Sequence, residues 1–283
     1  MGAPMAANLA RAGIEVHAYN RSRDKAETLA REFDNVTVAD SPAAAASAAG
    51  VAISMVPDVP EVEEVLLGSE GAAAGLPEGG LAIDMSTIAP SASRSIAGRL
   101  SERGIEFLDA PVTGSRPKAE DGTLTIMVGG SVESFDRAKP LFSAMGELVL
   151  HMGAQGHGSL VKLINNTLAA VNAAALAEGI SLARAGGLDL DKAMQVVGSG
   201  SGDSKMRELK AQPMIDGDHE ALFKLEHMLK DVRYFLAEAG SLAVESEVAR
   251  TAAGLYATAE ERGYGESDFS AVIEAIDTKS GLK

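Results

Sequence analysis

The sequence has no cysteine and no tryptophan among its 283 residues. Without cysteine there is no disulfide bond, thiolate metal site or cysteine nucleophile, and the composition suits a reducing cytoplasm. Positive charge is also scarce, because 40 acidic residues outnumber 25 basic ones and give a net charge of −15. A chain this acidic offers no basic stripe to a phosphate backbone, so we expect no nucleic-acid partner.

The sequence also lacks the patterns of a membrane protein and of a metal site. We find no apolar run that predicts a membrane span, and no basic segment followed by an apolar one, as in a signal peptide. The five histidines are scattered, and no pair has the spacing of metal ligands. Because 46% of the residues are hydrophobic, we expect a sizeable, well-packed core. Because these patterns are missing, we expect a cytoplasmic protein with no membrane partner and no metal.

Short apolar strands alternate with helical patterns in the first half of the chain. This alternation predicts a mostly parallel sheet with helices on both faces. We expect strands at residues 15–19, 36–38, 51–55, 81–84, 106–109, 125–128 and 148–151. We expect helices at residues 4–12, 22–33, 43–49, 60–67, 91–103 and 132–145. The connection 109–122 is expected to be irregular and to lie at a strand's carboxyl end, where open α/β sheets bind ligands.

The pattern changes at the glycine-rich segment GAQGHG, residues 153–158. Beyond it we find only helical patterns, at residues 159–185, 189–197, 220–239, 242–262 and 268–276. We therefore predict two domains. Residues 1–153 form a dinucleotide-binding α/β domain, and residues 154–283 form an all-helical substrate and oligomerisation domain that is entered through a long helix.

The chain opens as the second half of a dinucleotide-binding unit, with a helix that leads into a strand. In a complete unit a strand precedes the motif G-x-G-x-x-G, and the following helix N-terminus holds the pyrophosphate. Met1 and Gly2 correspond to the end of that motif. The first strand and the leading glycines are missing, so we expect the natural protein to begin upstream and this chain to bind its cofactor weakly.

The tripeptide Asn20-Arg21-Ser22 ends the next strand, where the residue that reads the ribose belongs. An acidic residue there favours NAD, whereas a neutral Asn followed by Arg can accept a 2′-phosphate, which favours NADP(H). In the alternative interpretation, Asn20 only caps a turn and Arg21 is a solvated surface charge.

Three further segments carry side chains suited to chemistry. In GHGSLVKLINN, Lys162 and Asn166 share one helical face, and a lysine partly removed from water can exchange a proton with a carbonyl oxygen. In DAPVTGS, Thr113, Gly114 and Ser115 offer hydroxyl and backbone N–H groups to a carboxylate. In FKLEHMLKDV, Phe223, His227 and Lys230 share the face of a predicted helix beside Asp231.

Each segment also has a simpler interpretation. Lys162 can be an exposed helical lysine, and the residues around Thr113 can form an ordinary surface loop in which Arg116 and Lys118 face solvent. Asp231 either pairs with a buried lysine or caps a neighbouring element.

Four segments, in the chain order MGAPMAANLARAG, DAPVTGS, GHGSLVKLINN and LKDV, resemble those of the β-hydroxyacid dehydrogenases. This family includes the 3-hydroxyisobutyrate dehydrogenase, tartronate semialdehyde reductase and glyoxylate or succinic semialdehyde reductase types. The family is related to 6-phosphogluconate dehydrogenase. The resemblance extends from Met1 to about residue 275. Thr113 stands where serine is common in the family, and Ser115 replaces what is often glycine, a pattern associated with the semialdehyde and glyoxylate reductase branch.

The resemblance implies a role for each segment. Lys162 would be the general acid/base, Asn166 would anchor the substrate, and Phe223 would line its pocket. Thr113, Gly114 and Ser115 would hold the substrate carboxylate. The implied cofactor-binding residues are Met1, Gly2, Asn20, Arg21, Ser22, Val56, Pro57, Thr87 and Lys230.

The resemblance therefore implies an NAD(P)-dependent oxidoreductase, with NADP(H) favoured, that interconverts a short β-hydroxy acid and its semialdehyde in a cleft between the domains. The partner is a small carboxylate-bearing aldehyde or hydroxy acid, and a homodimer or homotetramer is expected. One alternative is a non-catalytic cofactor-binding or scaffold protein on the same fold, suggested by the incomplete glycine motif. Another is an imine reductase, although such enzymes generally lack a lysine at the position of Lys162.

Overall fold

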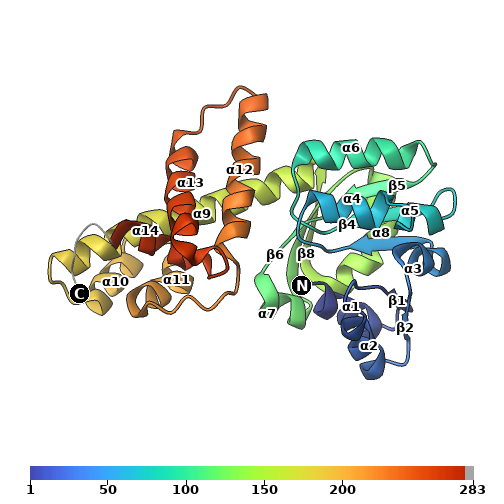
Figure 1. Cartoon of the computed structure of the whole chain (residues 1–283), viewed down its shortest axis with the longest axis horizontal. Coiled ribbons are helices and arrows are strands. Elements are labelled where there is room, and N and C mark those ends of the chain that lie inside the picture. The colour runs from blue at the N-terminus through green and yellow to red at the C-terminus, as the bar shows by residue number, and fades with distance from the viewer. Residues whose placement is uncertain (278–283) are drawn as a thin grey trace. The chain divides into compact units, whose positions relative to one another are not determined.

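The structure is a computed structural model that describes residues 1–277. The chain is divided into two units within one long helix, α9 (His157–Ala185). The first unit, Met1–Lys162, combines strands and helices, and the second begins at Leu163 and is helical in its described part (Figure 1). This order of an α/β part before an all-helical part confirms the predicted fold class.

The strands of the α/β unit form two sheets. In the smaller sheet β1 (Val16–Ala18) pairs in parallel with β2 (Val36–Val38). The larger sheet has the order β3-β4-β5-β7-β6, with β8 beside β7. Its strands are β3 (Val51–Ser54), β4 (Leu81–Asp84), β5 (Glu106–Asp109), β6 (Val112–Thr113), β7 (Leu124–Gly129) and β8 (Gly146–Gly153). In the part of the chain that the structure describes, no strand joins the two sheets.

Most strand pairs are parallel, including β7 with β8, and the antiparallel pairs are those of β7 with β5 and β6. Strands β3, β4 and β5 run parallel, whereas β7 runs antiparallel to β5 and to β6. The chain between β6 and β7 contains only the short helix α7 (Ser115–Asp121), which does not carry the chain across a face of the sheet. The expectation of an irregular 109–122 connection is therefore wrong at this helix.

Helices cover both faces of the larger sheet. Successive side chains of a strand point to opposite faces, and apolar side chains on each face pack against helices. In β4, Leu81 and Ile83 join a core with α1 (Gly2–Arg11) and α8 (Val132–Met145). Ala82, between them, joins a second core on the other face. That core includes α3 (Pro42–Ala49), α4 (Val59–Leu67), α5 (Ala72–Gly75) and α6 (Pro90–Ser101). Helix α2 (Arg23–Glu32) packs with α1 beside the smaller sheet.

The helical unit is built around α9. Its small side chains Ala170, Ala173 and Ala177 are fully buried and let neighbouring helices approach closely. The other elements are α10 (Leu190–Ser199), α11 (Lys205–Asp216), α12 (Leu225–Ser241), α13 (Glu247–Ala259), the turns η1 (Glu260–Tyr264) and η2 (Phe269–Ile273), and α14 (Glu274–Asp277). Helix α11, which contains Pro213, was not predicted, because proline obscures a helical pattern.

Two sequence expectations for this unit need correction. The helix expected from residue 220 begins only at Leu225, since the Asp268 carboxylate accepts the backbone N–H groups of Leu222 (3.2 Å) and Phe223 (3.1 Å) in a non-helical segment. Phe223 therefore does not share a helical face with His227 and Lys230. The helix expected over 242–262 is shorter as well, because α13 begins at Glu247 and ends at Ala259.

Helix α9 also corrects the expectation that no segment is apolar enough to span a membrane. It is 29 residues long, and an 18-residue window within it reaches a mean hydropathy of 1.3. Half of that window is buried inside the structure. A helix at the centre of a protein core has the same length and composition.

A close approach between α3 and α5 provides a test of this packing. A Cβ atom on Gly75 would lie 2.0 Å from the carbonyl oxygen of Ala43, a backbone atom that cannot move away cheaply. We expect Gly75→Ala to lower the free energy of unfolding by about 1–3 kcal/mol. Urea unfolding of the purified variant measures this change.

Gly98 of α6 is the matched control, because it is exposed and a Cβ atom on it would have no other atom within 4 Å. Gly98→Ala should raise the free energy of unfolding by about 0.5–1 kcal/mol, since alanine favours a helix over glycine. Equal changes in the two variants would contradict the close approach at Gly75.

Candidate active site

Three neighbouring strands of the larger sheet end in polar side chains. The register aligns Ser54 with Asp84 and Asp84 with Asp109 across β3, β4 and β5. Both aspartates are only 1% exposed. Open α/β sheets bind ligands at the carboxyl ends of their strands, so these buried acids lie beneath the edge where a ligand is expected. We did not predict either of them as a site residue, although an Asp that closes an apolar strand is a visible signal.

Asp84 organises the backbone that follows β3 and β4. The hydroxyl groups of Ser54 and Ser86 each donate a hydrogen bond of 2.7 Å to Asp84 Oδ1. The backbone N–H of Val56 donates to Ser86 Oγ (2.9 Å), so Asp84 is connected through Ser86 to a predicted cofactor-binding residue. Asp84 Oδ2 is buried with no hydrogen-bond partner among the described residues. Burial raises the pKa of Asp84 to about 6, although its hydrogen bonds with Ser54 and Ser86 act in the opposite direction.

The predicted cofactor residues of three elements gather at this edge. A Cβ atom on Gly2 would lie 3.6 Å from Met55 Cβ, so the N-terminus of α1 lies beside the end of β3. No side chain caps α1, and its first turn has no acidic residue. Val56 and Pro57 follow β3, and Thr87 follows β4. Uncapped N–H groups at a helix N-terminus bind anions, and this donor set fits the pyrophosphate of a dinucleotide.

The end of β1 carries the residues predicted to distinguish NADP from NAD. Asn20 Nδ2 donates to the carbonyl oxygen of Ser22 (2.9 Å), which is the turn-capping contact of the alternative interpretation. Arg23 bonds to the carboxylates of Glu27 and Asp40. Arg21 is exposed at the end of the strand, which is where a 2′-phosphate would need a cation.

The predicted substrate loop has an unusual backbone. Gly114 has φ = 135°, and a Cβ atom there would lie 2.7 Å from Lys118 Cβ, so only glycine fits. Ser115 has φ = 58°, a left-handed conformation that costs a non-glycine residue about 1–2 kcal/mol. Strained residues of this kind cluster at functional sites. Arg116 Nε lies 2.7 Å from Glu120 Oε1, and the Arg116 side chain is exposed, as the simpler interpretation expects.

Lys162 and Asn166 lie one turn apart in α9 and are buried, with exposures of 8% and 5%. This burial contradicts the interpretation of Lys162 as an exposed helical lysine. Asn166 Nδ2 donates to Asp231 Oδ2 at 2.7 Å, and Asn165 Nδ2 donates to Asn166 Oδ1 at 3.1 Å. The sequence left Asp231 undecided between a buried lysine and a neighbouring element, and the structure places its carboxylate beside both Asn166 and Lys230.

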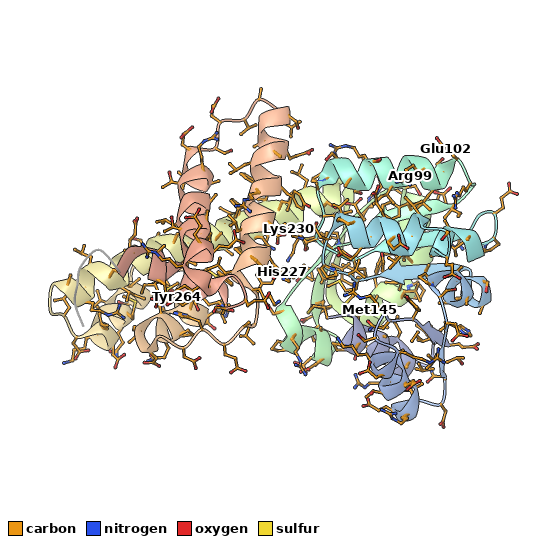
Figure 2. The ribbon with its side chains drawn as sticks, viewed as in Figure 1. Arg99, Glu102, Met145, His227, Lys230 and Tyr264 are labelled. Carbon is orange, nitrogen blue, oxygen red and sulfur yellow. The ribbon has the colours of Figure 1, made fainter. Side chains whose placement is uncertain are left out.

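Helix α12 contributes Lys230 beside Asp231, and Figure 2 shows Lys230 and His227 along this helix. Lys230 Nζ lies 3.5 Å from Asp231 Oδ1 and 5.5 Å from the centre of the Tyr234 ring. Phe223, just before the helix, has its ring centre 6.1 Å from those of His227 and Phe269. The structure thus brings Asn166, Lys230 and Asp231 together within the helical unit.

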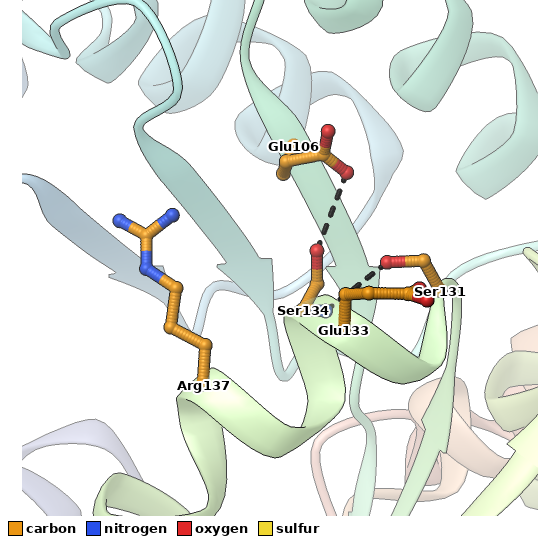
Figure 3. A pocket seen from close by; sticks show the side chains of 5 residues that line it. All are labelled: Glu106, Ser131, Glu133, Ser134 and Arg137. Atoms are coloured by element: carbon orange, nitrogen blue, oxygen red, sulfur yellow. Dashed lines mark hydrogen bonds between the residues drawn. The ribbon is translucent and has the colours of Figure 1, made fainter.

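A separate pocket of about 320 Å³ opens at the N-terminus of α8 (Figure 3). It is lined by Glu106, Ser131, Glu133, Ser134 and Arg137, none of which is a predicted site residue. Ser134 Oγ donates to Glu106 Oε2 (3.2 Å), and Arg137 donates to the carbonyl oxygen of Gly79 (2.7 Å). Because none of the predicted site residues lines this pocket, we do not assign it to the candidate active site.

Comparison with known proteins agrees with this geometry. Residues 1–153 match the model of the NAD-binding domain of 6-phosphogluconate dehydrogenase, and residues 156–276 match a model described as the NAD-binding domain of NADP-dependent 3-hydroxyisobutyrate dehydrogenase. The chain belongs to the β-hydroxyacid dehydrogenase family. As a member of this family, it is an NAD(P)-dependent oxidoreductase.

Similar β-hydroxyacid dehydrogenases span nearly the whole chain. A 2-hydroxy-3-oxopropionate reductase of Escherichia coli is 34% identical over 100% of this chain and 96% of its own. The chloroplastic glyoxylate/succinic semialdehyde reductase 2 of Arabidopsis thaliana is 34% identical over 98% of this chain and 76% of its own. The crystal structure of a 3-hydroxyisobutyrate dehydrogenase from Salmonella typhimurium has a TM-score of 0.87 at 31% identity, and covers 96% of this chain and 95% of its own.

The raised pKa of Asp84 predicts a pH dependence of stability for this dehydrogenase. Between about pH 4 and about pH 6 the folded state keeps a proton on Asp84 that the unfolded state has lost, so the free energy of unfolding falls as pH rises. A carboxyl pKa that is raised from 3.8 to about 6 on folding changes the free energy of unfolding by about 3 kcal/mol across this range. Asp84→Asn has no such proton, so the variant should gain stability relative to the wild type over this range.

Urea unfolding of both proteins at several pH values measures the difference. A difference that does not change between pH 4 and pH 7 would show that Asp84 titrates in the same range in the folded and unfolded states.

Proposed function

We propose that this dehydrogenase interconverts a short β-hydroxy acid and its semialdehyde, with Lys162 as the general acid/base. The observation that carries the proposal is the buried Lys162 one helical turn before Asn166, whose amide is held by Asp231. A positioned lysine side chain can act as general acid or base toward a carbonyl oxygen. The names of the reductases from E. coli and A. thaliana support a small aldehyde acid as substrate.

In this proposal, separate residues transfer the proton, anchor the substrate and line its pocket. When bound, NAD(P)H supplies the hydride that the aldehyde carbon accepts. Lys162 Nζ donates a proton to the aldehyde oxygen as negative charge develops there, and in the oxidation direction it takes the alcohol proton back. Asn166 anchors the substrate next to this lysine. Phe223 lines the apolar side of the pocket.

The substrate carboxylate is held by Thr113, Gly114 and Ser115. The Thr113 hydroxyl and the backbone N–H groups of the strained turn supply donors without a charged side chain. The positive φ values of Gly114 and Ser115 support this role, because successive amides in such turns form concave anion sites.

We further propose that NADP(H) is preferred over NAD(H), with Arg21 on the 2′-phosphate. Two arginines follow β1. Arg23 forms ion pairs with two carboxylates, so we assign the 2′-phosphate to the exposed Arg21. Lys230 belongs to the same proposal as a cofactor-binding residue on the nicotinamide side.

The proposed role of Lys162 is tested by Lys162→Ala and Lys162→Arg. Alanine has no proton to give, and arginine keeps its charge but does not deprotonate. We expect both variants to lose about 10²–10⁴ in kcat, with NADPH affinity retained. The measurement is NADPH oxidation with glyoxylate, succinic semialdehyde, tartronate semialdehyde and methylmalonate semialdehyde.

The exposed Lys192 of α10 is the matched control, and Lys192→Ala should keep the wild-type kcat. Full activity of Lys162→Ala would refute the role of Lys162. A folded wild-type protein that binds NADPH but turns over none of the four aldehydes would favour the non-catalytic alternative.

The cofactor preference is tested by Arg21→Ala. Loss of a charge-assisted hydrogen bond to the 2′-phosphate should raise the KM for NADPH about tenfold or more, whereas the KM for NADH should not change. Arg23→Ala removes a neighbouring arginine that is already paired, and it should alter neither constant. A parallel rise in both KM values in Arg21→Ala would contradict a contact with the 2′-phosphate.

A further inference from the structure

Asp109, at the end of β5, holds the beginning of α9. Its Oδ1 accepts the backbone N–H of Gly156 and the side-chain amide of Gln155, both at 2.7 Å. Its Oδ2 accepts the backbone N–H of Ser159 at 2.7 Å. All three donors lie within the seven residues that precede Lys162, and the carboxylate is almost completely buried.

The carboxylate of Asp109 sits in a space that two glycines leave open. A Cβ atom on Gly129 would lie 2.5 Å from Asp109 Oδ1. A Cβ atom on Gly158 would lie 2.6 Å from the Asp109 carbonyl oxygen and 3.0 Å from Oδ2. Any side chain at either position would push the carboxylate away from the helix, so the close approach of β5, β7 and α9 depends on both glycines.

The negative charge of Asp109 is favourable at the N-terminus of α9. The first turn of a helix has unpaired N–H groups and a partial positive charge, and a carboxylate satisfies both. Burial raises the pKa of Asp109, and the hydrogen bonds from Ser159 and Gly156 oppose that rise. Gln155 adds a second connection, because its Nε2 also bonds to Ser93 Oγ of α6 at 3.1 Å.

We propose that Asp109 is the positioning residue of the catalytic helix. By fixing the first turn of α9 to the end of β5, it sets where the side chain of Lys162, three residues beyond Ser159, lies relative to the strand ends that gather the cofactor residues. The inference rests on the proposed role of Lys162. Asp109 itself touches neither substrate nor cofactor in this scheme.

Asp109→Asn tests the proposal, because it keeps the shape and replaces one acceptor oxygen with an NH₂ group that faces a backbone N–H. A small displacement of the Lys162 amine from the reacting oxygen slows the chemical step. We therefore expect kcat to fall by about 10- to 100-fold. The KM for NADPH should stay near its wild-type value. Asp189→Asn is the matched control, since Asp189 Oδ1 accepts the N–H of Lys192 at the start of α10, and it should leave kcat and KM unchanged.

A measurement without turnover separates this proposal from the proposed function. Acetic anhydride labels lysine amines, and mass spectrometry of the holoenzyme with NADPH gives the labelling rate of Lys162 in each variant. Loosening of the first turn in Asp109→Asn should speed labelling of Lys162 about tenfold, while Asp189→Asn should keep the wild-type rate.

The outcomes are distinct. A fall in kcat together with faster labelling supports Asp109 as the positioning residue. Wild-type kcat and wild-type labelling in Asp109→Asn overturn it. If Lys162→Ala keeps full activity, the proposed function fails, and the labelling rate still shows whether Asp109 holds Lys162.

Discussion

Burial of charge at the ends of strands is the constraint on which the α/β unit depends. Asp84 and Asp109 are aligned across β4 and β5 and are almost excluded from solvent. Burying a carboxylate costs free energy that hydrogen-bond donors offset. Each aspartate therefore gathers hydroxyl or N–H groups from chain segments that are distant in sequence, and those segments carry Val56 in one case and the start of α9 in the other.

The helical unit uses the same device. Asp268 is buried and accepts Lys210 Nζ on both oxygens, at 2.8 and 3.0 Å. It also accepts the backbone N–H groups of Leu222 and Phe223. These backbone hydrogen bonds fix the conformation of the segment that contains Phe223. In both units a buried acid determines the backbone from which a proposed site residue projects.

In the proposed substrate loop, a strained backbone replaces a buried acid as the notable feature. Ser115 occupies a left-handed conformation that glycine would adopt without strain. Glycine is used where the backbone has no room, as at Gly114 and Gly158. Strained residues of this kind cluster at functional sites, which supports the proposed role of Ser115 in holding the substrate carboxylate.

Much of the fold was predictable from the sequence because it depends on local patterns. The alternation of strands and helices, the long helix after GAQGHG and the helical second half all follow from periodicity, and the family follows from four segments in order. Lys162 and Asn166 could be paired from their spacing alone, since residues four apart share a helical face. The start of α12 could not, because the helical pattern continues through residues 220–224, whereas contacts with the distant segment around Asp268 hold these residues out of the helix.

By itself the sequence determined the fold class, the family and the chemical identity of the acid/base candidate. Only the tertiary structure decided that Lys162 is buried, that Asp231 holds Asn166 and that Asp109 fixes the first turn of α9. The physical reason is the separation along the sequence of the residues that interact. Helix and strand patterns repeat within a few residues, whereas the partner of a buried charge lies 50 residues away for Ser159 and Asp109 and 65 for Asn166 and Asp231, and it is chosen by which segments the folded core brings together.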